Sequence, residues 1–237
     1  MPLPFAAYDK RHYRTVDVLE GYRLWSRSYD CRMTDDLDVA LLRRLASVDF
    51  GVDYAIDLAC GTGRTGSWLT SVGARRVDGV DLCPQMLDAA RQRGVYGELR
   101  LEDIRRTSLP GGQADLVINV LSVEHLPELD SLYAEVARLC RPGGVAVLVG
   151  FHPHFLLNGI PTHFDLDTGE SIAIENTIHL LSDHVTSAHR VGFQLQDLLE
   201  RVIDDELVAR APGWRHHRGM PASFALAWRN GHEPGAR

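Results

Sequence analysis

The feature that most constrains the fold is a short apolar run that ends in a glycine turn, at residues 54–64. Residues 54–58, Tyr-Ala-Ile-Asp-Leu, are typical of a buried strand, because short apolar runs bounded by turn residues pack inside a sheet. Gly61 and Gly63 follow, and residues without a Cβ let the backbone bend sharply and approach a ligand closely. The pattern then favours a helix over residues 66–72. Strand, turn and helix together predict a nucleotide-type binding corner at the carboxyl edge of a parallel sheet.

Two kinds of ligand fit this corner. Residues 61–66 satisfy the G-x-G-x-x-G pattern of dinucleotide-binding proteins, which keeps a NAD(P)-dependent oxidoreductase as an alternative. Asp57, inside the strand just before the glycines, argues the other way. Its carboxylate attracts a cationic ligand and repels a diphosphate. S-adenosylmethionine carries an ammonium and a sulfonium and no phosphate, and it is therefore the favoured cofactor.

Four later segments follow this corner in a specific order. Asp81 ends an apolar run about 20 residues beyond the glycines. Residues 101–104 read Leu-Glu-Asp-Ile, residues 115–120 form another apolar run, and residues 139–145 carry an Arg-Pro-Gly-Gly turn. In this order the segments resemble the motifs of the class I S-adenosylmethionine-dependent methyltransferases. The resemblance extends over residues 54–151.

The resemblance implies roles for individual residues. Asp81 is expected to bind the ribose hydroxyls, and Asp103 with the backbone N–H of Ile104 is expected to face the adenine. Helix capping is the alternative for both aspartates, since Asp is a good cap. Asp57 has an alternative role as a structural acid that bonds turn amides. The expected cofactor-binding residues are Asp57, Ala59, Cys60, Gly61, Gly63, Asp81, Leu82, Met86, Asp103, Ile104, Asn119 and Tyr29.

The alternation of strand and helix patterns after residue 54 predicts an α/β fold. The resemblance implies a Rossmann-like, seven-stranded, mostly parallel sheet with helices on both faces and the last strand antiparallel. Residues 1–53 are expected to form a helical lid or substrate region, and residues 54–237 a methyltransferase domain with a cap insertion at about residues 152–181. The expected strands are residues 54–58, 77–81, 98–101, 116–121, 145–151, 193–200 and 223–229, and the leucines of the sixth also suit a helix. The expected helices are residues 17–28, 35–48, 66–72, 85–93, 132–140 and 183–191, with a hairpin turn at residues 167–170.

The insertion also holds the strongest candidates for catalysis. His152 and His154 follow the fifth strand, where a methyl acceptor should lie, and imidazole titrates near neutral pH. A base is needed only if the acceptor starts protonated, as a hydroxyl does. An exposed or structural role is the alternative for each histidine, and His125 and His179 are weaker candidates. The aromatic residues Tyr22, Trp25 and Tyr29 are expected either to cover the sulfonium or to pack in the core.

Charge and cysteine content limit the kinds of partner and the compartment that are expected for this chain. The net charge is -7, which argues against a nucleic-acid substrate, because such proteins usually present a basic face. The four cysteines show no metal-ligand spacing, so no metal is expected, and free thiols indicate a reducing compartment. With no apparent signal peptide and no membrane-spanning run, a cytoplasmic protein without a membrane partner is expected.

These observations predict a methyltransferase that acts on a small-molecule acceptor at an O, N or C nucleophile. A protein that binds S-adenosylmethionine for regulation, without methyl transfer, remains the alternative from another functional class. The oligomeric state is left open, with a homodimer among the options.

Overall fold

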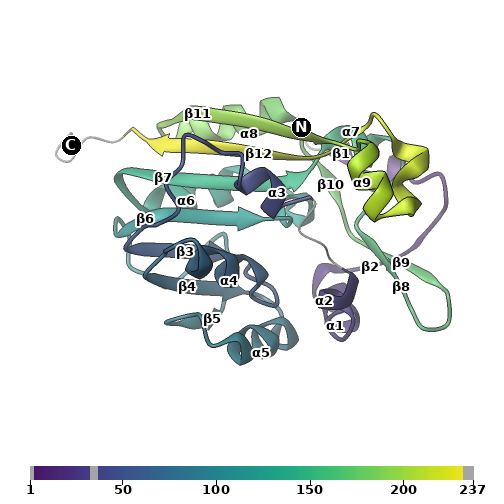
Figure 1. Ribbon diagram of the computed structural model, residues 1–237, viewed down its shortest axis with the longest axis horizontal. Coiled ribbons are helices and arrows are strands. Elements are labelled where there is room, and N and C mark those ends of the chain that lie inside the picture. Colours follow the sequence, from purple (N-terminus) through teal and green to yellow (C-terminus); the bar gives the residue numbers. More distant parts are fainter. Residues whose placement is uncertain (1–2, 33–36, 232–237) are drawn as a thin grey trace.

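The computed structural model describes residues 3–32 and 37–231, and its centre is a twisted seven-stranded sheet (Figure 1). The strand order is β11-β12-β7-β6-β3-β4-β5. Within the sheet, β7, β6, β3, β4 and β5 run parallel, whereas β12 lies antiparallel between β11 and β7. The strands are β3 (Tyr54–Leu58), β4 (Arg76–Asp81), β5 (Leu99–Leu101), β6 (Ala114–Val120), β7 (Cys140–Phe151), β11 (Phe193–Val202) and β12 (Pro221–Asn230). This confirms the predicted fold class, including the antiparallel last strand.

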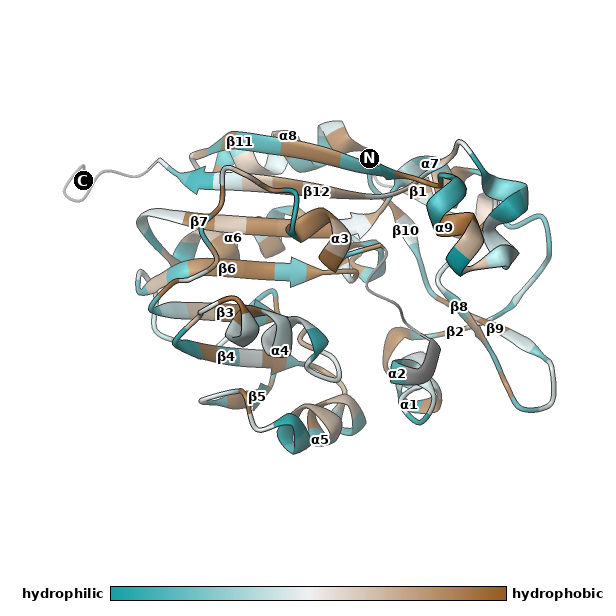
Figure 2. Cartoon of the chain, in the orientation of Figure 1, coloured by the Kyte–Doolittle hydropathy of each residue, from teal (hydrophilic) through white to brown (hydrophobic). Residues whose placement is uncertain are grey.

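Helices cover both faces of the sheet because its strands are apolar on both sides (Figure 2). On one face Ile56 and Leu58 of β3 share a core with Leu132 and Tyr133 of α6. On the other face Ala55 packs with residues of α3 and α4. The helices around the sheet are α3 (Val39–Leu42), α4 (Arg64–Ser71), α5 (Pro84–Arg93), α6 (Asp130–Leu139) and α8 (Leu181–Arg190).

The helix predicted over residues 35–48 is wrong in length. Its start lies outside the described residues, and the structure has only the single turn α3, Val39–Leu42. The amides of Arg44 and Leu45 bond back three residues rather than four, which ends the helix. Beyond it the apolar side chains are still buried, because Leu45, Val48 and Phe50 pack against the α4 face of the sheet. The apolar spacing therefore predicted the buried side chains but not the backbone.

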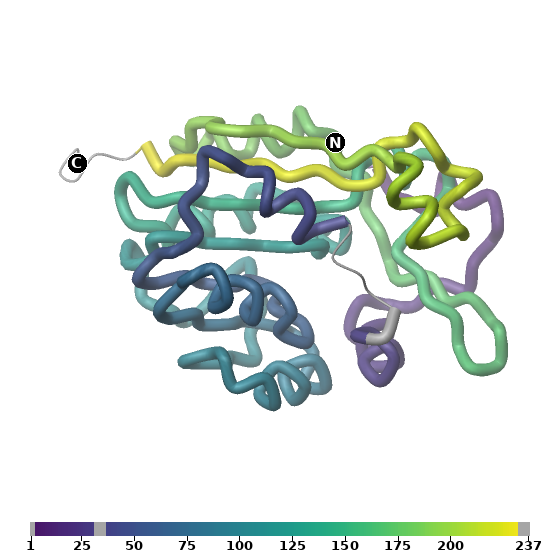
Figure 3. Tube along the Cα trace, in the orientation of Figure 1, coloured from purple at the N-terminus to yellow at the C-terminus, as the bar shows by residue number. Residues whose placement is uncertain are grey.

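The N-terminal segment and the insertion after β7 are joined by two small sheets. In one, β2 (Arg14–Val16) pairs in parallel with β9 (Ser171–Ile174), which also pairs with β8 (His163–Asp165). In the other, β1 (Leu3–Pro4) pairs with β10 (Thr177–Ile178). Figure 3 shows the purple N-terminal tube running beside the green insertion. The predicted hairpin turn at residues 167–170 is confirmed, since the Leu166 amide donates to the Glu170 carbonyl.

Two short helices of the N-terminal segment lie near the carboxyl ends of the parallel strands. They are α1 (Val18–Trp25) and α2 (Tyr29–Arg32), and α1 contacts both α5 and β9. Gly21 permits the second contact, because a Cβ there would lie 2.6 Å from the Ile174 side chain. The remaining elements are α7 (Pro153–Leu157), α9 (Asp205–Arg210) and the 3-10 turns η1 (Phe5–Ala7), η2 (Val123–His125) and η3 (Pro212–His217). Within the described ranges, no helix has both the length and the apolar character that crossing a bilayer demands.

Candidate functional site

A cavity of about 210 Å³ lies at the carboxyl ends of β3, β4 and β6, beneath α1 and α2. Most of its wall is apolar, and a few polar side chains project into it, as in typical small-molecule sites. Eight of the predicted cofactor-binding residues line it, namely Tyr29, Ala59, Gly61, Asp81, Leu82, Met86, Asp103 and Ile104. The other lining residues are Val18, Leu19, Tyr22, Cys83, Arg105, Val120, Leu121, Ser122, His125, Leu126 and Pro127.

In the glycine turn, one glycine faces the cavity and two pack against a protein side chain. Gly61 has a φ of 52°, and a Cβ built on it would meet nothing within 4 Å, so its bare backbone faces the open cavity. Gly63 and Gly66 are instead packed against Tyr96. A Cβ would lie 3.0 Å from the Tyr96 ring at Gly63 and 2.3 Å from it at Gly66. Gly61 is therefore the glycine of this motif that admits a ligand.

Asp57 does not line the cavity. It is fully buried, and its Oδ2 accepts a hydrogen bond of 2.7 Å from the Tyr96 hydroxyl. Burial raises the pKa of Asp57 to about 7, although the Tyr96 hydroxyl and the Gly66 amide favour the charged form. A carboxyl that is partly protonated at neutral pH supplies less negative charge than the sequence argument assumed. Its position fits the structural alternative, in which it holds the turn in shape.

Asp81 lies on the cavity wall at the end of β4. Its Oδ2 accepts from the Gly61 amide and its Oδ1 from the Cys83 amide, each at 2.8 Å. These bonds fix the glycine turn to the start of α5. Burial raises the pKa of Asp81, while the amides of Cys83 and Gly61 favour the carboxylate. Two carboxylate oxygens offer about four acceptor positions, so two amides leave capacity for vicinal hydroxyls.

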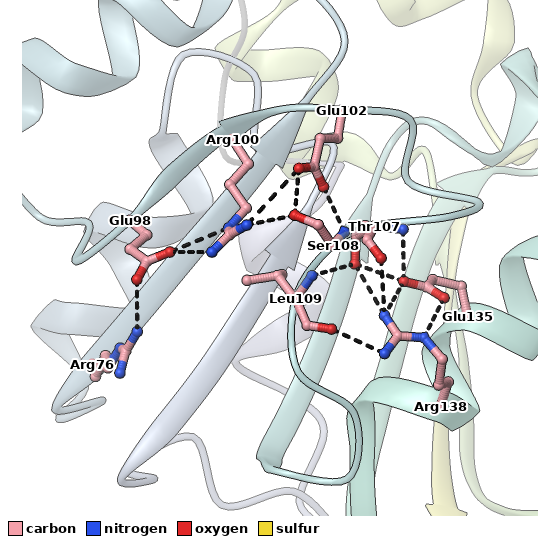
Figure 4. A network of polar contacts seen from close by, with 9 residues as sticks. All are labelled: Arg76, Glu98, Arg100, Glu102, Thr107, Ser108, Leu109, Glu135 and Arg138. Atoms are coloured by element: carbon pink, nitrogen blue, oxygen red, sulfur yellow. Dashed lines mark hydrogen bonds and ion pairs between the residues drawn. The ribbon is translucent and has the colours of Figure 1, made fainter.

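Asp103 and Ile104 reach the cavity from the loop after β5. Asp103 forms an ion pair with Arg105, whose Nη2 lies 2.6 Å from Oδ2, and the Arg105 guanidinium lowers the pKa of this carboxyl. Polar contacts on the outer side hold the rest of this loop (Figure 4). Glu102 accepts from the Ser108 amide at 2.7 Å, and Glu135 of α6 accepts from the Thr107 amide at 2.8 Å.

A smaller cavity of about 30 Å³ adjoins the first on the other side of Gly61. Its wall includes Cys60 together with Arg64 and Asp38, whose side chains are mostly buried and lie 3.1 Å apart. A guanidinium beside a carboxylate can bind a carboxylate and an ammonium at once, which are the groups at the amino-acid end of S-adenosylmethionine. In the N-terminal segment, Asp30 of α2 accepts from Arg93 Nη2 at 2.6 Å, which ties α2 to α5.

A histidine and a tyrosine meet on the wall opposite the glycine turn. His125 Nδ1 lies 2.7 Å from the Glu175 carbonyl oxygen, which can only accept, so we assign the proton to Nδ1. The free Nε2 then accepts from the Tyr22 hydroxyl at 2.9 Å. Burial lowers the pKa of His125 to about 4, so the ring is neutral at pH 7. Burial raises the pKa of Tyr22, which keeps its proton.

His152 and His154 do not line either cavity. His152 is the N-cap of α7, and its Nδ1 accepts from the His154 amide at 3.1 Å. Its Nε2 is 2.7 Å from Glu200 of β11. The His154 side chain is exposed. These contacts give His152 a structural role at the start of α7, and they bring neither histidine to the cavity wall.

Asn119 is fully buried, and its Nδ2 donates to the Leu58 carbonyl oxygen and to Ser122 Oγ, so it braces the strand ends from behind. Gly63 lies away from both cavities, against Tyr96. Of the aromatic lid candidates, Tyr22 and Tyr29 line the main cavity, whereas Trp25 stacks on Phe164 and packs with Ile172 and Ile174 of β9.

Among wall residues at the end of β6 and in the turn after it, sequence reasoning named only His125, as a weaker candidate, although the cavity wall includes Val120, Leu121, Ser122, His125, Leu126 and Pro127. Leu121 has a φ of 53°, a strained value for a branched side chain that often marks functional backbone. The sequence offered one signal for this turn, which is its position in the chain. The turn follows a buried parallel strand next to β3, so it must lie at the same end of the sheet as the glycine turn.

The fold is that of the class I S-adenosylmethionine-dependent methyltransferases. Residues 56–148 match the model of the methyltransferase domain family. The chain is 28% identical to an uncharacterized methyltransferase of Emericella nidulans, over 87% of this chain and 89% of that protein. It is 26% identical to a phosphatidylethanolamine N-methyltransferase of Cereibacter sphaeroides, over 82% of this chain and 90% of that protein.

The fold also matches a solved structure. The crystal structure of an S-adenosylmethionine-dependent methyltransferase from Mesorhizobium loti matches with a TM-score of 0.66 at 22% identity, covering 81% of this chain and 96% of that one. The matches to the methyltransferase domain family and to this fold indicate S-adenosylmethionine as the cofactor. The acceptor has to be argued from the residues of this chain.

Proposed function

We propose that the protein transfers a methyl group from S-adenosylmethionine to a small molecule bound beside Tyr22 and His125. The observation that carries this proposal is the hydrogen-bonded pair of these two side chains on the wall of the cofactor cavity. A cavity of about 210 Å³ beneath α1 and α2 suits a small acceptor group. The net charge of -7 counts against a nucleic-acid acceptor.

The cavity residues fit the cofactor. Asp81 has acceptor capacity for the ribose hydroxyls, Gly61 presents bare backbone, and Ile104 and Met86 supply apolar surface for a flat ring. Arg64 and Asp38 suit the amino-acid end. When bound, S-adenosylmethionine supplies an activated methyl group whose transfer leaves a neutral thioether.

Tyr22 and His125 can remove the proton that the acceptor must lose. The acceptor O–H or N–H donates to the Tyr22 oxygen, and Tyr22 passes its own proton to His125 Nε2. The Glu175 carbonyl, 2.7 Å from Nδ1, stabilises the imidazolium that forms. Positioned proton transfer of this kind contributes about 10²–10⁴-fold to a rate. We therefore assign the base to His125, acting through Tyr22, in place of His152 or His154.

The experiment separates binding from turnover. Formation of S-adenosylhomocysteine is followed over a panel of small hydroxylated and amine metabolites, and binding of S-adenosylhomocysteine is measured by calorimetry. We expect His125→Ala and Tyr22→Phe to lower turnover by about 100-fold while affinity for S-adenosylhomocysteine changes little. His152→Ala is the matched control. A larger loss in that control would return the base to His152, and tight binding with no methylated product from any acceptor would favour a regulatory binding protein.

The location of the protein in the cell is also part of the proposal. The cysteines Cys60, Cys83 and Cys140 are free and buried in the described part of the chain. Unpaired thiols are usual in a reducing compartment, so we propose a cytoplasmic enzyme.

A further inference from the structure

Asn176 lies in the insertion after β7, and its side chain comes next to the ring of His125 although the mechanism above does not use it. It directly precedes β10, and its Oδ1 accepts from the Thr162 amide at 2.7 Å. Because a backbone N–H can only donate, this bond identifies the oxygen end of the Asn176 side chain. The NH₂ end is therefore the one that lies beside Glu175 and His125.

This NH₂ group forms a triangle with two other polar atoms. Asn176 Nδ2 lies 3.2 Å from the Glu175 carbonyl oxygen and 3.3 Å from His125 Nδ1, and the last two atoms lie 2.7 Å apart. The shortest contact joins the ring nitrogen to an oxygen that can only accept, so Nδ1 is the donor. A protonated Nδ1 cannot accept from Asn176, so the NH₂ group donates to the second lone pair of the same carbonyl. Asn176 thus acts on the ring through the carbonyl that both donors share.

The shared carbonyl determines which ring nitrogen is free. In a neutral imidazole, the hydrogen bond made by one nitrogen sets the proton there and leaves the other nitrogen as an acceptor. His125 Nε2 lies 2.9 Å from the Tyr22 hydroxyl, and both residues line the main cavity. Glu175 is anchored to β2, because its amide donates to the Val16 carbonyl oxygen at 2.9 Å. Asn176 restrains the same residue at its carbonyl oxygen.

The side of the ring that faces Asn176 is occupied by neutral groups. They are the Glu175 carbonyl and the Asn176 amide, both at Nδ1. At η2, β7 contributes Gly150, which has no side chain. A negative charge placed at Nδ1 would therefore act directly on the imidazolium. The titratable residues near His125 include its hydrogen-bond partner Tyr22, its neighbour Glu124 in η2, the exposed Glu175, and His179, which bonds the Leu126 carbonyl.

We propose that Asn176 is a positioning residue for His125. It holds the Glu175 carbonyl as the acceptor of the Nδ1 proton, and it thereby keeps Nε2 free for the proton that Tyr22 passes on. The inference rests on the proposed function and adds the residue that prepares its base. It also gives the insertion after β7 a part in proton transfer, because the Thr162 amide fixes the Asn176 side chain.

NMR of the full chain labelled with ¹⁵N-histidine tests this role without turnover, and His125→Ala identifies the His125 signals. We expect the wild-type ring to be neutral at pH 7 with its proton on Nδ1. Asn176→Asp keeps the shape of the side chain and places a carboxylate oxygen where Nδ2 lies, 3.3 Å from Nδ1. An opposite charge this close favours the imidazolium. The variant should therefore raise the pKa of His125, which burial holds at about 4, by about one to three pH units.

Asn158→Asp is the matched control, since it makes the same change of charge away from both cavities. Asn158 is the C-cap of α7, and its Nδ2 donates to the His154 carbonyl oxygen at 2.7 Å. The pKa of His125 should change much less in this variant, because solvent and salt screen a distant surface charge. Asn176→Ala provides a second variant that adds no charge. It releases the Glu175 carbonyl, so the tautomer protonated on Nε2 should appear beside the Nδ1 form.

The inference is overturned if the wild-type ring carries its proton on Nε2. It is also overturned if the tautomer and pKa of His125 in both Asn176 variants match those of the wild type. The proposed function is tested separately by the pH dependence of kcat/KM for an acceptor that the wild type methylates. Because only a neutral His125 can accept a proton, the acid limb should move to higher pH in Asn176→Asp by as much as the pKa does. A raised pKa with an unmoved acid limb would support the role of Asn176 at the ring and refute His125 as the base.

Discussion

The contact between Asp81 and the glycine turn allows a quantitative test of the cofactor site. Asp81→Ala removes the acceptor of two amide hydrogen bonds of 2.8 Å and the carboxylate expected to hold the ribose. A hydrogen bond to a charged group contributes about 1.5–3 kcal/mol. Since about 1.4 kcal/mol is tenfold in Kd, loss of one such bond to the cofactor should raise the Kd of S-adenosylhomocysteine about 10- to 100-fold.

The assay is isothermal titration of folded variants with S-adenosylhomocysteine, with circular dichroism to confirm folding. Asp78→Asn is a matched control, because Asp78 is a buried acid on the same strand that bonds Tyr54 and Arg76 instead of facing the cavity. That variant should lose stability but keep the Kd within about twofold, as expected for a separate site. A folded Asp81→Ala protein with unchanged affinity, or an equal loss in Asp78→Asn, would refute the ribose assignment.

Two further predictions concern stability. Burial raises the pKa of Asp57 from 3.8 to about 7, so the folded state holds this proton more tightly than the unfolded chain. The stability that this proton contributes is complete below pH 3.8 and is lost as the pH rises to about 7. In urea titrations over this range, the free energy of unfolding of the wild type should fall by about 4 kcal/mol relative to that of Asp57→Asn. Parallel curves of stability against pH for the two proteins would contradict the reasoning. Gly66→Ala puts a Cβ 2.3 Å from Tyr96 and should lower the free energy of unfolding by about 2 kcal/mol. The loss should be smaller in a Tyr96→Ala background, and an equal loss in both backgrounds would rule out the steric cause.

Much of the central sheet could be predicted from the sequence because its strands are buried on both faces. Such strands appear as continuous apolar runs, and the glycine turn and the chain order then fix which edge carries the site. Strand β11 was harder, since its exposed positions include Leu195 and Leu198 and its pattern suits a helix equally well. The helix predicted to continue beyond Leu42 failed because tertiary packing of Leu45 and Phe50 replaced regular backbone bonding.

The candidate site likewise contains residues that could be predicted from the sequence and residues that could not. Residues at strand ends, such as Asp81 and Gly61, could be predicted because their positions follow from the strand order. The hydrogen bond between His125 and Tyr22 could not be predicted, because the two side chains come from distant segments of the chain and no local pattern marks them. The sequence around His152 contains a pattern that indicates a helix cap. It directly precedes Pro153, and a proline in the first turn of a helix makes the residue before it a cap.

The parallel pairing of β2 with β9 has a consequence for engineering the acceptor range of this enzyme. A chimera that grafts only the insertion from a relative would leave Arg14–Val16 facing a foreign edge, and the Glu175 carbonyl that orients His125 follows directly after that edge. Recombination that exchanges the N-terminal segment and the insertion together preserves the pairing of β2 with β9. Libraries built on this scaffold should therefore use three crossover points together, one before the glycine turn and one on each side of the insertion after β7.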